Sequence, residues 1–241
     1  GLEAFLNNLK YYREKNKSNI IGANIGKNKN STNLYSDYQM LFENISPFVN
    51  YITINISSPN TKGLRDLQKK GNIEKLIEKI ILSNKNNLPT FIKVSPDILD
   101  KDLENICNIC LKEKMISGLV ISNTTVTRSS LHTKQIRNSW KINEDGGLSG
   151  PPLKTITNLV IKKVYRITRG KILIIGVGGV SDGYDAFEKI SLGCNLVQIY
   201  TSLIYQGPDV VIKILTELSD LVKKNGFSNI SEVVGKNLKN A

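Results

Sequence analysis

Short apolar runs alternate with longer amphipathic segments along the whole chain, and this alternation constrains the fold more than any other feature. Such a pattern is typical of parallel strands joined by helices. We expect about six strand–helix units in the 241 residues, each strand being an apolar run and each helix a segment with a 3.6-residue period. The expected strands are 20–26, 51–57, 90–95, 118–124, 171–177 and 196–201, and the expected helices are 33–46, 73–84, 100–114, 152–169, 184–192, 208–225 and 229–237.

Polar residues follow several of these apolar runs, where the expected strands end. These residues are Asn24, Asn55, Lys93, Asn123 and the pair Gly178–Gly179. The carboxyl ends of the strands form the active-site face of a (β/α)8 barrel, but an open doubly wound sheet also binds ligands there. The strand ends therefore predict a site and leave the two folds open.

The glycine-rich segment 176–183 favours one of them. It is similar to a dinucleotide-binding fingerprint, yet no Asp or Glu ends the next expected strand, 196–201, so a Rossmann fold is poorly supported. A Gly-Gly turn after the penultimate strand, with a last strand ending at Tyr200 and Thr201, is typical of the phosphate site of a barrel. The alternative is that these glycines only permit a tight turn. The expected fold class is α/β, a (β/α)8 TIM barrel with about six of its eight units present.

The segment NISSPNT, which begins at Asn55, places amide and hydroxyl groups directly after a strand. Alternation along residues 51–56 predicts that the isoleucines face the packed side and that Asn55 faces the other side. Asn60 and Thr61 add donors and acceptors suited to a planar ligand rich in amide groups. Ser58 is the only residue of the turn with a side chain that ordinarily acts as a nucleophile or proton acceptor. The alternative is an Asx/Ser turn that only closes a loop.

The composition argues against several classes of protein. The formal net charge is +12, but the basic residues are dispersed among Asn-rich stretches, so we expect no nucleic-acid partner. His132 is the only histidine, which argues against histidine-based metal sites and Ser-His or Cys-His catalysis, and we expect no metal. Cys107 and Cys110 match C-x-x-C but lie inside an expected helix, so we expect them to be buried thiols in a reducing compartment. The sequence contains no apolar run of about 20 residues, so it predicts no membrane span.

Two further features concern the organisation of the chain. Roughly 25 residues separate the strand ending at Thr124 from the helix expected at Pro152, and a connection of that length predicts a lid, which ends in the segment Gly146–Gly150. The chain begins at Gly1 rather than Met. If its last two strands are the seventh and eighth of a barrel, about two units are missing, so we expect residues 1–241 to be the C-terminal portion of a single barrel domain.

Taken together, the motifs resemble class 2 dihydroorotate dehydrogenase. The resemblance is carried, in order, by GANIGKNK around Asn24, NISSPNT at 55–61 with GLRD at 63–66, FIKVSPD around Lys93, SNTTVTR at 122–128, GGLSGPPL at 146–153, IIGVGGV at 174–180 and LVQIYTSLIYQGP at 196–208. Ser58 indicates class 2, because class 1 enzymes resemble this turn but carry Cys as the base.

This resemblance implies an FMN cofactor, oxidation of (S)-dihydroorotate to orotate in de novo pyrimidine biosynthesis, and a ubiquinone-type quinone as the final electron acceptor. It implies substrate contacts from Asn55, Asn60, Asn123 and Thr124. The residues that it assigns to FMN are Asn24, Asn55, Lys93, Ser122, Gly150, Gly178, Gly179, Tyr200 and Thr201.

The implied catalytic residues are Ser58, Thr61 and Lys93. Ser58 would remove the proton from C5 of dihydroorotate while hydride passes from C6 to flavin N5. A lone Ser is a poor base, so we expect a polar relay through a water and Thr61. Lys93 would stabilise the negative charge of the reduced flavin.

The resemblance also implies a location. Class 2 enzymes build their quinone tunnel from an N-terminal helical segment that this sequence does not include. Through that segment they associate peripherally with the bacterial inner membrane or, in eukaryotes, with the mitochondrial inner membrane.

Two other hypotheses stay open. Another FMN barrel, such as a dihydrouridine synthase acting on tRNA, would make use of the positive charge, but we would expect it to place a Cys acid near a mobile loop. A non-catalytic binding protein would retain the barrel, and a flavin spectrum of the purified protein would exclude it.

Overall fold

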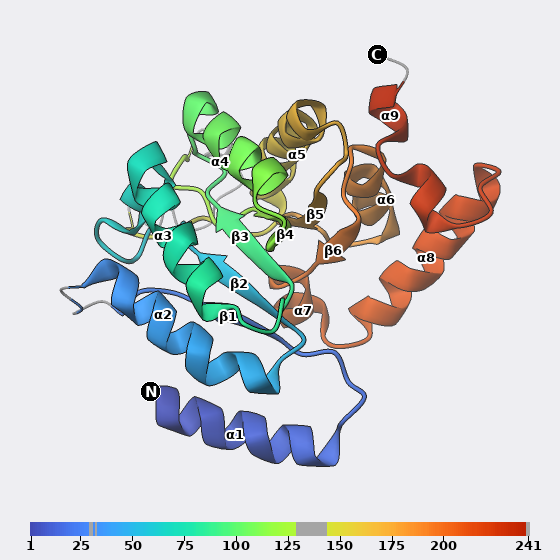
Figure 1. The fold of residues 1–241 in the computed structure, drawn as a ribbon. Coiled ribbons are helices and arrows are strands. Elements are labelled where there is room, and N and C mark those ends of the chain that lie inside the picture. The colour runs from blue at the N-terminus through green and yellow to red at the C-terminus, as the bar shows by residue number, and fades with distance from the viewer. Residues whose placement is uncertain (29–30, 32, 129–143, 240–241) are drawn as a thin grey trace.

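The structure is a computed structural model that describes residues 1–28, 31, 33–128 and 144–239. Within these ranges, six parallel strands form one curled sheet in which each strand pairs with the next along the chain (Figure 1). The strands are β1 (Gly22–Ile25), β2 (Tyr51–Asn55), β3 (Thr90–Val94), β4 (Ile116–Ile121), β5 (Leu173–Val177) and β6 (Leu196–Gln198). Consecutive parallel strands are the arrangement of a β/α barrel, so the expected fold class and six strands are confirmed.

Helices follow the strands and cover the outer face of the curled sheet (Figure 1). The α-helices are α1 (Leu2–Lys15), α2 (Leu34–Ile45), α3 (Lys70–Ser83), α4 (Asp100–Lys112), α5 (Lys154–Thr168), α6 (Gly183–Ser191), α7 (Thr201–Gln206), α8 (Val210–Lys224) and α9 (Lys236–Lys239). Short 3₁₀ helices are η1 (Ser46–Phe48), η2 (Leu64–Gln68), η5 (Pro151–Leu153) and η6 (Ile230–Val233). Buried residues recur every three or four positions on α3 and α4, as expected of helices that pack one face on a sheet.

Side chains of the strands alternate between an outer and an inner layer. The outer row contains Ile54, Ile92, Leu119 and Ile174, which pair in register and are fully buried in the main core. The inner row contains Phe91, Val120 and Ile175, which form a separate small apolar cluster. Lys93 lies two residues beyond Phe91 on the same face of β3. The inner face therefore changes from apolar to polar toward the carboxyl ends of the strands.

Two expectations about buried side chains are confirmed. The isoleucines of β2 and its extension, at positions 52, 54 and 56, are all fully buried in the main core. Cys107 and Cys110 are buried on α4, where burial raises the pKa of the Cys107 thiol to about 12 and also raises that of Cys110. These thiols pack as apolar residues and are poor nucleophiles.

Three expectations at the C-terminal end of the chain are wrong in detail. The last strand ends at Gln198 rather than Thr201, and Tyr200 precedes the short helix α7. The 3.6-residue period of the helix expected at 208–225 predicts one packed face of Val211, Ile214, Leu215, Leu218 and Val222. On α8, however, Val211 and Leu215 are 43% and 61% exposed, while Val210, Ile214 and Val222 are buried. The single helix expected near 229–237 is instead η6 followed by α9. His132 and residues 129–143 of the expected lid lie outside the described residues.

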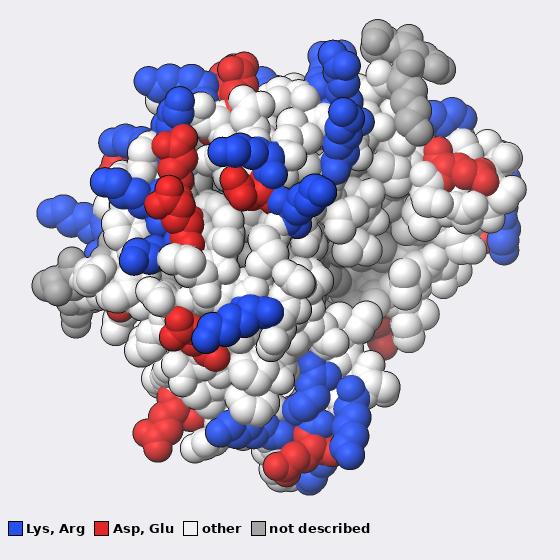
Figure 2. All heavy atoms as spheres, in the orientation of Figure 1, with Lys and Arg blue, Asp and Glu red and all other residues white. Residues whose placement is uncertain are grey.

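Basic side chains on the face shown in Figure 2 do not gather into one stripe. On the face shown in Figure 2, Lys and Arg side chains form several separate groups, interspersed with Asp and Glu and divided by uncharged surface. In the part of the chain that the structure describes, no helix has the length and apolar character needed to cross a membrane.

Candidate active site

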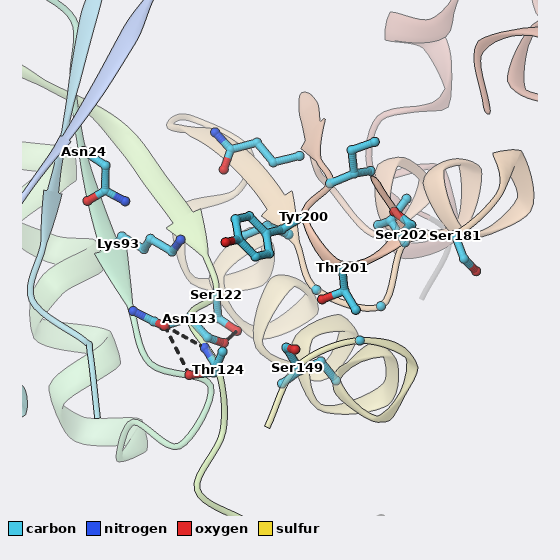
Figure 3. Close-up of a pocket in the computed structure, with 18 of the residues that line it drawn as sticks. Asn24, Lys93, Ser122, Asn123, Thr124, Ser149, Ser181, Tyr200, Thr201 and Ser202 are labelled. Carbon is cyan, nitrogen blue, oxygen red and sulfur yellow. Dashed lines mark hydrogen bonds between the residues drawn. The ribbon is translucent and has the colours of Figure 1, made fainter. Parts of the chain in front are cut away.

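A cavity of about 730 Å³ lies at the carboxyl ends of the strands, above the inner apolar cluster (Figure 3). Its volume is within the roughly 300–1,000 Å³ typical of small-molecule sites. The expected site residues that line it are Asn24, Lys93, Ser122, Asn123, Thr124, Gly150, Gly178, Gly179, Tyr200 and Thr201. Residues from five different strand ends thus meet in one place.

Lys93 supplies a partly buried positive charge to this cavity. It lies on β3 beside Asn55 of β2, and in Figure 3 its ammonium points into the cavity toward Tyr200. Burial lowers the pKa of Lys93 from its ordinary value. Among the described residues, Lys93 has neither an ion-pair partner nor a hydrogen-bond partner. A partly buried cation without a protein partner is suited to bind an anionic or electron-rich ligand.

A glycine turn forms the opposite side of the cavity. Gly178 and Gly179 follow β5 and have φ values of 111° and 71°, in the region that only glycine adopts readily. A Cβ on Gly179 would lie 2.7 Å from the backbone nitrogen of Lys154, so the turn passes very close to the start of α5. Glycine at position 179 permits this close packing, and both glycines also line the cavity.

Ser202 adds an unsatisfied hydroxyl to the same side. Its Oγ is buried and has no hydrogen-bond partner among the described residues, although the residue lines the cavity. Buried hydroxyls normally have partners. The donor and acceptor capacity of Ser202 is therefore available to a ligand, and no pattern in the sequence pointed to it.

Amide side chains connect the loops after β2 and β4. The Nδ2 of Asn123 donates to the Oδ1 of Asn55 at 3.2 Å and to the Oγ of Ser57 at 3.1 Å. The Oδ1 of Asn123 accepts from the backbone N–H of Thr124 at 2.8 Å. The structure thus brings three expected substrate residues together, and it adds Ser57, which the sequence did not single out.

The expected residues that do not line the cavity are Asn55, at the end of β2, and Ser58, Asn60 and Thr61, on the turn that follows it. The Oγ of Ser58 accepts from the backbone N–H of Asn60 at 3.3 Å, and the Ser58 residue is partly exposed. Gly147 packs against Pro59 and Thr124, so this turn adjoins the loop after β4. No hydrogen bond links Ser58 to Thr61 within the described part of the chain.

A buried lysine lies behind the glycine turn. Lys189 of α6 is fully buried, and its Nζ donates to the Oγ1 of Thr157 at 2.7 Å and to the Oδ1 of Asn158 at 2.8 Å. The Thr157 hydroxyl in turn lies 3.4 Å from the carbonyl oxygen of Gly178, to which it can donate. Burial lowers the pKa of Lys189 to about 8. Neutral partners thus hold a lysine whose charge is costly to bury.

We expect the free energy of unfolding to depend on pH because of this buried lysine. The folded-state pKa of Lys189 is about 8 and its ordinary value is 10.5, so the unfolded state binds more protons between these values. The free energy of unfolding should therefore rise with pH through this window. Between pH 7 and pH 10 the Lys189 contribution is about 2 kcal/mol. Urea unfolding of the wild type and of Lys189→Met at both pH values measures this contribution. The difference in free energy of unfolding between the two proteins should change by about 2 kcal/mol from pH 7 to pH 10.

Lys213→Met is the matched control, because Lys213 is an exposed lysine on the neighbouring helix α8. Its difference from the wild type should not change with pH. The Cys194 thiol beside Lys189 stays protonated over this range, because burial raises its pKa to about 12. A Lys189→Met difference that is constant with pH would show that Lys189 keeps an ordinary pKa.

The chain is similar to known proteins of one family. The family profile of dihydroorotate dehydrogenase matches residues 1–222. The chain is 40% identical over 220 residues to the mitochondrial dihydroorotate dehydrogenase (quinone) of Mus musculus, covering 89% of this chain and 54% of that protein. It is 38% identical over 239 residues to the dihydroorotate dehydrogenase (quinone) of Novosphingobium aromaticivorans, covering 98% of this chain and 66% of that protein.

A solved structure of the same family is similar to this chain. The crystal structure of DHODH from Eimeria tenella in complex with ferulenol superimposes with a TM-score of 0.91 at 30% identity, covering 99% of this chain and 69% of that chain. The chain thus spans between 54% and 66% of the length of the two curated relatives. On the match of the family profile and on these identities, the chain belongs to the dihydroorotate dehydrogenase family.

Proposed function

We propose that this chain carries the FMN site and the substrate residues of a quinone-dependent dihydroorotate dehydrogenase. The reaction is oxidation of (S)-dihydroorotate to orotate in pyrimidine biosynthesis, with a ubiquinone-type quinone as the final acceptor and peripheral membrane association. The observation that carries the proposal is Lys93, a partly buried cation that points into the cavity and has no protein partner among the described residues. The family is flavin-dependent, and its relatives are named as quinone-dependent enzymes.

The residues of the cavity fit FMN. The unpartnered Oγ of Ser202, the backbone of the glycine turn at Gly178–Gly179 and the hydroxyl of Thr201 suit a phosphate. Lys93 and Asn24 would hold the polar edge of the isoalloxazine ring, with Ser122 and Gly150 also lining its site. When bound, FMN supplies the acceptor for the substrate hydride.

The loops after β2 and β4 provide groups for the substrate. Asn55, Asn60, Asn123 and Thr124 would bind the ring amides and carboxylate of dihydroorotate. Ser58 would accept the proton from C5. The backbone N–H of Asn60 donates to its Oγ, an interaction that stabilises the deprotonated form. Thr61 would complete a relay to solvent through a water. Lys93 would balance the negative charge that accumulates during the reaction.

The proposal is tested by loading the protein with FMN and adding dihydroorotate without oxygen. Loss of the visible flavin absorbance and formation of orotate are the expected results, and addition of a short-chain ubiquinone should restore the absorbance. Dihydrouracil, which lacks the carboxylate, is the matched control and should react much more slowly. If dihydroorotate did not reduce the flavin, and if flavin reduced chemically with dithionite were reoxidised by unmodified tRNA as its uridine became dihydrouridine, the chain would instead be a dihydrouridine synthase.

A further inference from the structure

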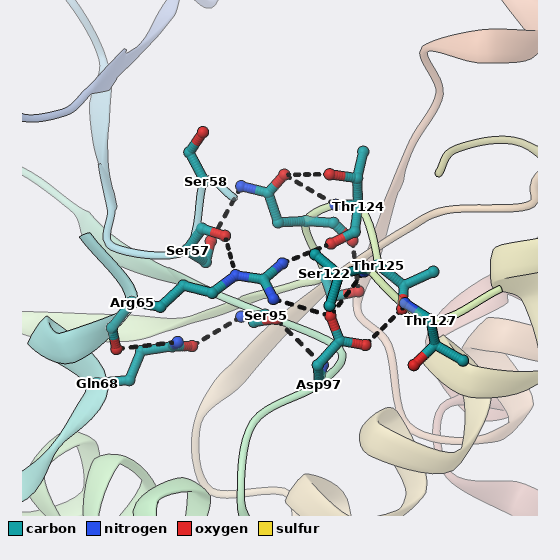
Figure 4. A network of polar contacts seen from close by, with 12 residues as sticks. Ser57, Ser58, Arg65, Gln68, Ser95, Asp97, Ser122, Thr124, Thr125 and Thr127 are labelled. Atoms are coloured by element: carbon teal, nitrogen blue, oxygen red, sulfur yellow. Dashed lines mark hydrogen bonds and ion pairs between the residues drawn. The ribbon is translucent and has the colours of Figure 1, made fainter. Parts of the chain in front are cut away.

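Arg65 connects the loops that follow three neighbouring strands, β2, β3 and β4 (Figure 4). It lies on η2, and its Nε donates to the carbonyl oxygen of Ser57 at 3.2 Å. One terminal nitrogen donates to the Oδ2 of Asp97 at 2.9 Å, and the other donates to the carbonyl oxygen of Thr124 at 3.1 Å. A single guanidinium therefore fixes the three loops relative to one another.

Asp97 completes the connection from the loop after β3. Its carboxylate accepts from the hydroxyl of Thr125 and, at 3.0 Å, from the backbone N–H of Val126. Its own backbone N–H donates to the Oγ of Ser95 at 3.1 Å. The loop after β4 is thus held twice, once by each member of the Arg65–Asp97 pair.

The pair is protected from solvent. The side chains of Arg65 and Asp97 are 25% and 17% exposed, so their interaction is screened less than that of an exposed surface pair. The planar fork of arginine can reach two carbonyls and a carboxylate at once, whereas the single ammonium of lysine cannot match this geometry. The spacing of the loops therefore depends on the guanidinium itself and not only on its charge.

These loops carry residues that the proposed reaction needs. Ser58 follows Ser57 directly, and Thr124 is one of the residues assigned to the substrate. In Figure 4 the Ser58 hydroxyl points away from the guanidinium, so Arg65 can influence it only through the backbone of Ser57. Neither Arg65 nor Asp97 lines the cavity.

We propose that Arg65 and Asp97 are positioning residues, which set the separation between the Ser58 loop and the Asn123–Thr124 loop. This proposal rests on the proposed function, in which Ser58 accepts a proton from a substrate held by Asn123 and Thr124. Small errors of placement are costly in such an arrangement, because a displacement of about 1 Å can slow a reaction about 100-fold.

The test uses Arg65→Lys in the FMN-loaded protein. We expect the rate of flavin reduction at saturating dihydroorotate to fall about 10- to 100-fold. The dissociation constant of FMN should stay within about twofold of the wild-type value, because the pair does not line the cavity. The pH profile of the rate should keep its shape, since the proton acceptor itself is unchanged. Asp97→Asn should show the same separation of effects.

Arg13→Lys is the matched control. Arg13 is a partly buried arginine that donates to the carbonyl oxygen of Phe48 at 3.1 Å and to the side chain of Asn50 at 2.7 Å, away from the site. Its loss should lower stability without slowing flavin reduction. An Arg65→Lys rate equal to the wild type would overturn the proposal, and so would a loss of rate matched by equal losses of FMN affinity and stability.

Hydrogen exchange without FMN tests the connection independently. The Ser57 N–H bonds to Asn55 and the Val126 N–H bonds to Asp97. In Arg65→Lys both amides should exchange faster, by about tenfold. Acceleration in only one loop, or in neither, would refute the connection. A wild-type protein that does not oxidise dihydroorotate would refute the proposed function, while the exchange result would still decide whether Arg65 couples the loops.

Discussion

Ser58→Ala is expected to slow flavin reduction by dihydroorotate by about 10²- to 10⁴-fold, the range typical of losing a general base. The substrate should still bind, because its contacts come from the amide residues and Thr124. Single-turnover reduction of the bound flavin, measured at several dihydroorotate concentrations, separates the rate at saturation from the dissociation constant. The largest effect should be on the rate.

Two other variants sharpen this test. Ser58→Cys should recover rate mainly below the wild-type pH optimum, because a thiol with an ordinary pKa of about 8.5 ionises far more readily than a hydroxyl. Ser228→Ala, at an exposed serine far along the chain, should have no effect. If Ser58→Ala raised the dissociation constant and left the rate at saturation unchanged, Ser58 would be a binding or turn residue.

Lys93→Met is expected to weaken FMN retention and to slow flavin reduction, together costing about 2 to 4 kcal/mol of stabilisation, by comparison with the loss of an oxyanion-hole donor. The variant should fold at least as stably as the wild type, because burial already lowers the pKa of Lys93 and the charge is costly to keep there. Equilibrium dialysis of FMN, stopped-flow reduction and urea unfolding measure the three quantities.

Lys213→Met again serves as the control, since it removes an exposed lysine whose partner Glu217 lies 4.0 Å away. It should leave FMN retention and reduction unchanged. Full FMN occupancy and an unchanged rate in Lys93→Met would reject the role assigned to Lys93. A variant that lost FMN only in proportion to a loss of stability would reject it as well.

Local patterns in the sequence were sufficient to predict the strands and most of the expected residues that line the cavity. Apolar runs and helical periods depend on neighbouring residues, so they predict strands such as β2 and the polar strand ends at Asn24 and Lys93. The six residues of α7 are too few for a helical period to be recognised. The apolar residues of α8 form two adjoining stripes, and only the fold shows that Ile214 is covered while Leu215 is exposed.

Contacts between distant residues could not be predicted in this way. Arg65 and Asp97 are separated by 32 positions and Arg65 and Thr124 by 59, so no local pattern joins them. Arg65 stood within the motif GLRD, but nothing in the sequence showed which groups it would contact. The unsatisfied hydroxyl of Ser202 also depends on what surrounds it in three dimensions.

The ends of the curled sheet have a consequence for how a polypeptide of residues 1–241 behaves in concentrated solution. Within the described residues, β1 pairs only with β2 and β6 pairs only with β5, so each has one side without a strand partner. Exposed apolar residues lie at both ends, with Ile20 81% and Leu196 57% exposed. Free strand edges are templates for pairing between molecules, although short edges limit it. The net charge of +12 opposes such association. Because salt screens this repulsion, colloidal stability depends on ionic strength as well as on folding.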